Sequence, residues 1–233
     1  MKREEYIENL LQLYSLVAVL SRKNGCKVLH LRNKNNGKDL ILRSLPGSSA
    51  VYHKLLNIRC ANLPEIYDVI ELDDGLIVLE EYIDGLTAAQ VMESGKYHDR
   101  GARKVLCGVC DALTVLHNRH IVHRDVKPEN IMIEKSGRVV LIDLNASRVE
   151  SDANRDTIIL GTVGYASPEQ LGFSQTDART DIYAAGVLYN VMLTGQHPSV
   201  TIASGKAGRI IRKCTAVNPN ERYQTAAELW SVL

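Results

Sequence analysis

The chain of 233 residues has no excess of charge and no long hydrophobic run. Lys and Arg number 28 against 27 Asp and Glu, which gives a formal net charge of +1. Because bulk charge is balanced, composition gives no electrostatic reason to expect a nucleic acid or an anionic membrane as a partner. The sequence also lacks the run of about 18 apolar residues that a membrane span needs. We therefore expect neither nucleic-acid nor membrane contact within this chain.

The chain also lacks the cysteine spacing of a disulfide framework or a zinc ribbon. Its cysteines are an odd, scattered set, Cys26, Cys60, Cys107, Cys110 and Cys214. Such a set is typical of a reducing compartment. Residues 1–14 are charged and then amphipathic, unlike the apolar core of a signal peptide. These features predict a cytoplasmic location.

Neither an internal repeat nor a low-complexity linker interrupts the sequence, which indicates one domain over residues 1–233. The first hundred residues favour an antiparallel sheet, because short apolar or alternating runs are separated by the turn dipeptides Asn36-Gly37 and Asp74-Gly75. The predicted strands cover residues 15–20, 27–31, 39–45 and 76–82.

From about residue 101 the hydrophobic period changes to that of helices. A long helix is expected there, followed by short strands at 131–133 and 139–143 and a helix over 181–193. Thr225 and Glu228 have the capping-box spacing that opens a last helix. The predicted fold class is α+β, with a small antiparallel β-sheet lobe (1–82) and a larger helical lobe (83–233).

The most specific motif reads His-Arg-Asp-Val-Lys-Pro-Glu-Asn over residues 123–130, with Asp143 following at the end of an apolar strand. It closely resembles the catalytic loop and metal-binding aspartate of protein kinases. The resemblance implies the two-lobed protein-kinase-like fold. Lys127 marks the serine/threonine type, and the stretches 161–170 and 180–195 are similar to bacterial serine/threonine kinase domains.

Transfer of the γ-phosphoryl group of ATP needs an oriented hydroxyl nucleophile, Mg²⁺ and a cation near the transferred group. The resemblance makes Asp125 the base and places Lys127 against the γ-phosphate. It makes Asn130 and Asp143 the Mg²⁺ ligands, and their oxygens are the hard donors that Mg²⁺ prefers. The implied cofactors are ATP and Mg²⁺, and the implied partner is a protein substrate.

A second block, residues 161–169, is similar to the substrate-docking end of a kinase activation loop. Ser167 before Pro168 also suits a helix N-cap. The resemblance pairs Glu169 of this block with Arg222 in a structural ion pair, and it makes Asp181 a brace for the catalytic loop.

The first lobe departs from the family pattern at its phosphate-binding hairpin. The three glycine positions hold Ser21, Lys23 and Cys26, so side chains would crowd or re-aim the loop. The same resemblance puts Leu20 and Val28 of this hairpin in the nucleotide site. Lys23 and Lys27 are alternative phosphate cations, and an ordinary surface hairpin is the other interpretation.

The strand lysine of the family is replaced by Arg43, and no acidic residue occurs between Asp39 and Glu65 to supply its usual helix glutamate. Arginine is longer and planar, so the exchange is not conservative at a geometric site. The resemblance places Glu80 at the border of the adenine pocket and makes Glu81 and Tyr82 the hinge. After Asp143 the triplet continues with Leu144 and Asn145, where the family has phenylalanine and glycine, and asparagine tolerates the left-handed backbone better than most non-glycine residues.

Other patterns have competing interpretations. Cys107 and Cys110 have thioredoxin spacing but are expected to pack in the helix core. A zinc site at His117, His120 and His123 is disfavoured because no carboxylate or cysteine cluster adjoins them. The hydroxyls of the activation segment that the resemblance implies are either regulatory phosphorylation sites or loop solvation, namely Ser147, Ser151, Thr157 and Thr162. For Thr162 a bond to Asp125 and Lys127 is favoured over regulation.

Two functions with one fold remain open. The first is an active serine/threonine protein kinase with an atypical phosphate clamp. The second is a pseudokinase that binds nucleotide weakly or not at all and acts as an allosteric or scaffolding module. Retention of Asp125, Lys127, Asn130 and Asp143 favours the first, and the docking block at 161–169 disfavours a small-molecule kinase. The sequence leaves the oligomeric state open.

Overall fold

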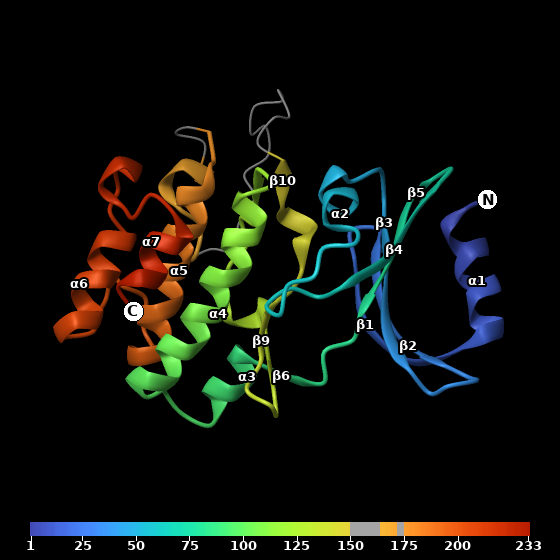
Figure 1. The fold of residues 1–233 in the computed structure, drawn as a ribbon, viewed down its shortest axis with the longest axis horizontal. Coiled ribbons are helices and arrows are strands. Elements are labelled where there is room, and N and C mark those ends of the chain that lie inside the picture. The colour runs from blue at the N-terminus through green and yellow to red at the C-terminus, as the bar shows by residue number, and fades with distance from the viewer. Residues whose placement is uncertain (150–163, 172–174) are drawn as a thin grey trace. The chain divides into compact units, whose positions relative to one another are not determined.

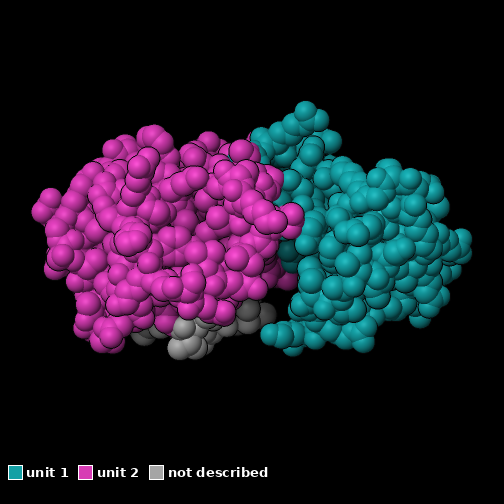
Figure 2. All heavy atoms as spheres, turned by 90° about the horizontal axis from the view of Figure 1, so that it is seen from below, with its two compact units in different colours: residues 1–60, 64–83 teal, residues 61–63, 84–233 magenta. Residues whose placement is uncertain are grey.

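The computed structural model describes residues 1–149, 164–171 and 175–233, and the chain forms two compact units (Figures 1 and 2). Unit 1 comprises Met1–Cys60 and Pro64–Ile83, and unit 2 comprises Ala61–Leu63 and Asp84–Leu233. Unit 1 is built on an antiparallel sheet and unit 2 is mainly helical. This composition confirms the predicted α+β class.

Unit 1 contains a five-stranded antiparallel sheet in the order β1-β2-β3-β5-β4. All four predicted strands are present, and β4 is the partner that the Asp74-Gly75 turn implied. The strands are β1 (Tyr14–Lys23), β2 (Cys26–Asn33), β3 (Asp39–Leu45), β4 (Ile66–Leu72) and β5 (Gly75–Glu81).

The hairpin turns need left-handed backbone, and the sequence supplies it. Gly37 has a φ of 71° between β2 and β3, as its Asn-Gly dipeptide predicted. Between β1 and β2, Asn24 and Gly25 have φ values of 51° and 75°. This hairpin therefore closes in two residues, with Lys23 directly opposite Cys26.

Helix α1 (Arg3–Leu13) covers one face of this sheet, and α2 (Ala50–Leu55) lies on the other side (Figure 1). The amino group of Met1 contacts Asp73 Oδ2 at 2.7 Å, and the backbone N of Arg3 donates to Asp74 Oδ1 at 2.8 Å. These contacts hold the start of α1 at the β4–β5 turn. The core under α1 contains Ile7, Leu29, Leu31, Leu40, Leu42 and Ile77.

Unit 2 is organised around α4 (Asp99–His117), which packs against α5 (Ala178–Thr194), α7 (Ala226–Ser231) and strand β9. The predicted apolar face of α4 is buried. Helix α6 (Gly205–Cys214) packs on α5, and α3 (Ala88–Glu93) precedes α4. In the described ranges no helix combines the length and apolarity that crossing a bilayer requires.

Short strands and turns frame the loops of unit 2. One sheet has the order β6-β8-β9 and the other pairs β7 with β10. The strands are β6 (Gly85–Thr87), β7 (Ile121–Val122), β8 (Ile131–Glu134), β9 (Val139–Leu141) and β10 (Arg148–Val149). The predicted capping of α7 is present, because Thr225 Oγ1 accepts a hydrogen bond from the backbone N of Glu228 at 3.0 Å.

The predicted ion pair of Glu169 and Arg222 lies in the interior of unit 2. It is bidentate, with Nη1–Oε1 and Nη2–Oε2 distances of 2.6 and 2.9 Å. The Arg222 guanidinium also donates to the carbonyls of Ala216, Arg179 and Val217. Burial raises the pKa of Glu169, but the hydrogen bonds and charge of Arg222, together with hydrogen bonds from the backbone and Ser167, outweigh burial, and the net pKa is lowered. This pair ties the segment around residue 169 to the end of the chain.

Removing the arginine should destabilise unit 2 strongly, because a buried carboxylate would lose its counter-ion. We expect Arg222→Ala to lower the free energy of unfolding by roughly 3–5 kcal/mol. Urea denaturation measures the change. Arg209→Ala, at an exposed position on α6, is the matched control and should stay within about 0.5 kcal/mol of wild type. A loss in Arg222→Ala no larger than in the control would contradict this account.

The same pair predicts sensitivity to acid. Because the folded-state pKa of Glu169 lies below its ordinary value of 4.5, its contribution is complete above pH 4.5 and is lost as the pH falls through the folded-state pKa. The unfolding free energy should therefore fall less steeply below pH 4.5 in the double variant Glu169→Gln/Arg222→Met than in wild type. Equal slopes in urea titrations would refute the assignment.

Candidate active site

The catalytic-loop motif lies between β7 and β8, and a buried carboxylate holds its first residues. Asp181 of α5 accepts hydrogen bonds from the backbone N of His123 at 2.9 Å and of Arg124 at 2.8 Å. His117, near the end of α4, contacts the same carboxylate at 2.8 Å. The predicted bracing role of Asp181 is thereby confirmed.

Arg124 has a left-handed backbone with φ of 68°, which is unfavourable for a residue with a side chain. Its N–H is held by Asp181, and its carbonyl accepts from Gln170 Nε2 at 2.8 Å. Gln170 was not predicted as a site residue. Its Oε1 also accepts from the N of Ser167 at 3.1 Å, so the Ser-Pro-Glu-Gln spacing, a capping-box pattern, was the available signal.

Three predicted site residues meet directly. The Lys127 Nζ lies 2.7 Å from Asp125 Oδ2, and Asn130 Nδ2 donates to the same oxygen at 2.8 Å and to the Asp125 carbonyl at 2.9 Å. Asp125 and Lys127 are half-buried, and Asn130 is buried. Because its amide nitrogen faces Asp125, the Asn130 side chain directs its carbonyl oxygen away from that carboxylate.

Asp143 follows on a segment bonded to this loop. The backbone N of Ile142 donates to the Asn130 carbonyl at 2.8 Å, and His123 Nε2 contacts the Ile142 carbonyl at 3.2 Å. Asn130 and Asp143 therefore lie on neighbouring segments. Asp125 and Asp143 both act electrostatically on the buried His123, raising its pKa, but complete burial dominates and the net pKa is lowered.

The left-handed residue of the triplet at 143–145 is its first one. Asp143 has a φ of 67° and caps a 3₁₀ turn over Leu144–Ala146 through a bond from the N of Asn145. Asn145 lies inside this turn, so its tolerance of left-handed backbone is not used.

Asn130 and Asp143 offer one amide oxygen and one carboxylate, both hard donors. Oxygen donors of this kind suit Mg²⁺, which takes few protein ligands and keeps waters or phosphate oxygens for the rest. Chemically, therefore, the pair fits the predicted metal.

In unit 1, Arg43 makes a short ion pair with Glu80, at 2.6 Å from Nε to Oε1. Val28 lies directly opposite Arg43 in the β2–β3 ladder, so both project from the same face. This is the face away from α1, since the neighbouring Leu29 and Leu42 pack under that helix. The predicted residues Val28 and Arg43 thus share one surface.

The other residues of unit 1 that were predicted to bind nucleotide are Leu20, Glu81 and Tyr82. Leu20 is 55% exposed on β1. Glu81 Oε2 accepts from the N of Glu65 at 3.2 Å. The Tyr82 ring stacks on His30, with 4.0 Å between ring centroids.

The hairpin at the glycine positions is a regular ladder. Ser21 pairs with Val28, and Lys23 pairs with Cys26. Lys27 forms an ion pair with Glu4 of α1. This pair lies on the α1 face of the sheet, opposite to the face of Val28 and Arg43. The Lys27 ammonium is therefore an ion-pair partner of α1.

The sequence left competing interpretations for two cysteines and for the hydroxyl groups of the activation segment. Cys110 is fully buried and Cys107 half-buried, and burial raises the pKa of both thiols, which opposes thiolate chemistry. Ser147 Oγ donates to the His123 carbonyl at 3.2 Å. Ser151, Thr157 and Thr162 lie outside the described residues, as do positions 161–163 of the docking block.

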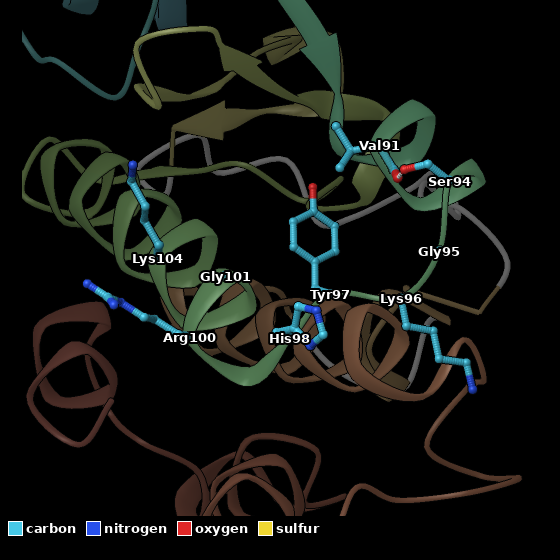
Figure 3. Close-up of a pocket in the computed structure, with 9 residues that line it drawn as sticks. All are labelled: Val91, Ser94, Gly95, Lys96, Tyr97, His98, Arg100, Gly101 and Lys104. Atoms are coloured by element: carbon cyan, nitrogen blue, oxygen red, sulfur yellow. Dashed lines mark hydrogen bonds between the residues drawn. The ribbon is translucent and has the colours of Figure 1, made fainter.

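A cavity of about 770 Å³ lies elsewhere in unit 2, between the end of α3 and the first turns of α4 (Figure 3). Figure 3 shows the Tyr97 ring directed toward Val91, and burial raises the pKa of Tyr97 to about 12. The lining residues also include Lys96, Arg100 and Lys104. None of the catalytic-loop residues lines this cavity, so its cationic rim is separate from the candidate site.

Comparison with known proteins agrees with this geometry. Residues 26–231 match the protein kinase domain family, and the chain belongs to that family. It is 32% identical over 180 residues to the serine/threonine-protein kinase PknB of Mycolicibacterium smegmatis, covering 65% of this chain and 29% of that protein. The serine/threonine-protein kinase PrkC of Bacillus subtilis is 29% identical over 239 residues, covering 91% and 36%.

A probable serine/threonine-protein kinase of Streptomyces coelicolor, SCO3848, is 27% identical over 259 residues, which cover 93% of this chain and 38% of that protein. The chain thus spans about a third of the length of these relatives. The likeness concerns their kinase domains, and the resemblance inferred from the sequence is confirmed.

The brace predicts that Asp181→Asn weakens the catalytic loop. Asparagine has one acceptor oxygen, so one of the buried N–H groups of His123 and Arg124 would lose its partner, at a cost of about 1–3 kcal/mol. Urea denaturation should show this loss, and hydrogen exchange should speed up at those two amides. Asp111→Asn, at an exposed position on α4, should change neither. Unaltered exchange in Asp181→Asn would be inconsistent with the brace.

Proposed function

We propose that this domain is an ATP- and Mg²⁺-dependent serine/threonine protein kinase that transfers the γ-phosphate to protein hydroxyl groups. The observation that supports the proposal best is the direct contact of Asp125 with both Lys127 and Asn130. A loop with no catalytic role has no need to keep a carboxylate, an ammonium and an amide together at a strained, braced turn.

In the proposed reaction Asp125 orients the attacking hydroxyl and takes its proton. Lys127, beside the same carboxylate, supplies positive charge toward the transferred group. The short Lys127–Asp125 contact holds the carboxylate in place. The bonds from Asn130 fix the orientation of Asp125 further.

Asn130 and Asp143 would hold Mg²⁺, which when bound neutralises charge on the phosphate oxygens. Their contribution is to place two hard oxygen donors on segments joined by the Ile142–Asn130 backbone bond. The 3₁₀ turn capped by Asp143 fixes the direction of that side chain.

In unit 1 the proposal gives Arg43 the contact with the α- and β-phosphates, and Leu20 and Val28 the contact with adenine. Glu81 and Tyr82 provide the hinge, through backbone groups. Arg43 and Val28 share one face of the sheet, which supports a common role.

The alternative function is a pseudokinase that acts through its surfaces. The β1–β2 hairpin favours this alternative, because Ser21, Lys23 and Cys26 carry side chains where the family has glycines. It predicts no γ-phosphate transfer, and no rise in melting temperature when millimolar ATP and Mg²⁺ are added.

The proposed roles predict the result of two substitutions. Asp125→Asn keeps the shape of the side chain but removes the base, and Asp143→Asn removes the carboxylate ligand. Each should lower Mg²⁺-dependent transfer to a generic protein substrate by at least about 100-fold, the usual scale for a general base. Radiolabelled γ-phosphate transfer measures the rates.

Asp111→Asn is again the matched control and should keep wild-type transfer. Full activity in Asp125→Asn would contradict the assignment of Asp125 as the general base. Absence of transfer by wild type, together with an unchanged melting temperature in ATP and Mg²⁺, would establish the scaffold alternative.

A further inference from the structure

The ion pair of Arg43 and Glu80 is buried on one face of the sheet of unit 1. The two side chains are only 7% and 5% exposed, and the Nε–Oε1 distance is 2.6 Å. Arg43 lies opposite Val78 in the β3–β5 ladder, two residues before Glu80. Side chains two positions apart on a strand share a face, so the pair is a diagonal contact between hydrogen-bonded strands.

In the protein kinase family a helix of the first lobe supplies the glutamate that pairs with the strand lysine. The helix in unit 1 that would do so, α2, supplies no carboxylate. Helix α2 spans Ala50–Leu55, and its ionisable side chains include His53 and Lys54 but no acid. His53 contacts Glu71 of β4 instead. A carboxylate for Arg43 therefore comes from the neighbouring strand, through Glu80.

Because the carboxylate comes from a strand, the orientation of the Arg43 guanidinium depends on the sheet and not on α2. Strands β3 and β5 pair without interruption from Leu40 opposite Glu81 to Leu45 opposite Leu76. A side-chain pair across this ladder keeps its geometry whatever the position of α2. Because guanidinium is planar and rigid, a short bond at Nε fixes the plane of the whole group and the direction of its terminal nitrogens.

We infer that Glu80 is the positioning residue for Arg43 and orients it from within the sheet, in place of a glutamate on helix α2. The inference rests on the proposed function, because it takes Arg43 as the cation that holds the α- and β-phosphates. Glu80 acts through Arg43 and needs no contact with the nucleotide.

The test compares ATP binding and steady-state kinetics in wild type, Glu80→Gln and Glu71→Gln. Glutamine keeps the size of Glu80 but loses the charge that aligns the guanidinium. We expect Glu80→Gln to raise the Kd and KM for ATP by about tenfold, equivalent to ~1.4 kcal/mol, with kcat within about threefold of wild type. Glu71→Gln removes an exposed sheet carboxylate that faces His53 and should leave these constants unchanged.

A second comparison tests whether Glu80 acts through Arg43 alone. Removing one member of a buried pair destabilises a fold, whereas replacing both with apolar side chains is often tolerated. We therefore compare Arg43→Met with Arg43→Met/Glu80→Met. If Glu80 works through Arg43, both variants bind ATP equally weakly, although the double variant is the more stable; unequal binding would mean that Glu80 acts on the nucleotide independently of Arg43. If Glu80→Gln does not fold, Glu80→Asp, which keeps the charge but shortens the side chain, replaces it in the Kd comparison.

Several results would overturn the inference. An unchanged or lower Kd in Glu80→Gln would mean that Glu80 is idle or withholds Arg43 from the nucleotide. A wild-type Kd in Arg43→Met would remove the role of Arg43 itself. ATP binding without phosphate transfer by wild type would refute the kinase proposal alone, and the Kd comparison would still decide the role of Glu80. No ATP binding by wild type would refute both.

Discussion

The geometry of the candidate site depends on one buried carboxylate. Asp181 accepts the backbone N–H groups of His123 and Arg124, and thereby holds a left-handed residue directly before Asp125. Without such acceptors, two donors would be buried unpaired and the strained turn would relax. Because Asp181 is carried by the long helix α5 inside the core of unit 2, the loop has the rigidity of that core.

In unit 1 the buried charge that needs a partner is the guanidinium of Arg43. An arginine stands where the family has a lysine, and the carboxylate of Glu80 pairs with it across a β-ladder rather than from a helix. A helix can tilt against a sheet, but neighbouring strands are fixed by their hydrogen bonds. Two departures from the family pattern thus occur together in this unit, because α2 carries no acidic side chain and Glu80 lies beside Arg43.

Local patterns predicted much of this structure. Alternating runs located the strands of unit 1, helical spacing located α4, and the Thr225–Glu228 spacing located α7, because each depends only on nearby residues. The partner of Arg43 could not be read in this way, since it depends on β5 lying beside β3 although β4 intervenes in the chain. The left-handed backbone of Asp143 could not be located from residue type, which indicates only tolerance of that backbone, whereas the 3₁₀ turn over Leu144–Ala146 decides its position.

Helix α1 and strand β1 lie before residue 26, where the match to the family begins. Yet α1 packs over Leu29, Leu31 and Leu42, and β1 occupies the edge next to β2. A gene fragment trimmed to the family boundary would leave β2 as an open, apolar edge, the kind of surface that seeds aggregation. A domain with a covered β2 edge thus includes residues 1–25, which the family match from residue 26 leaves out.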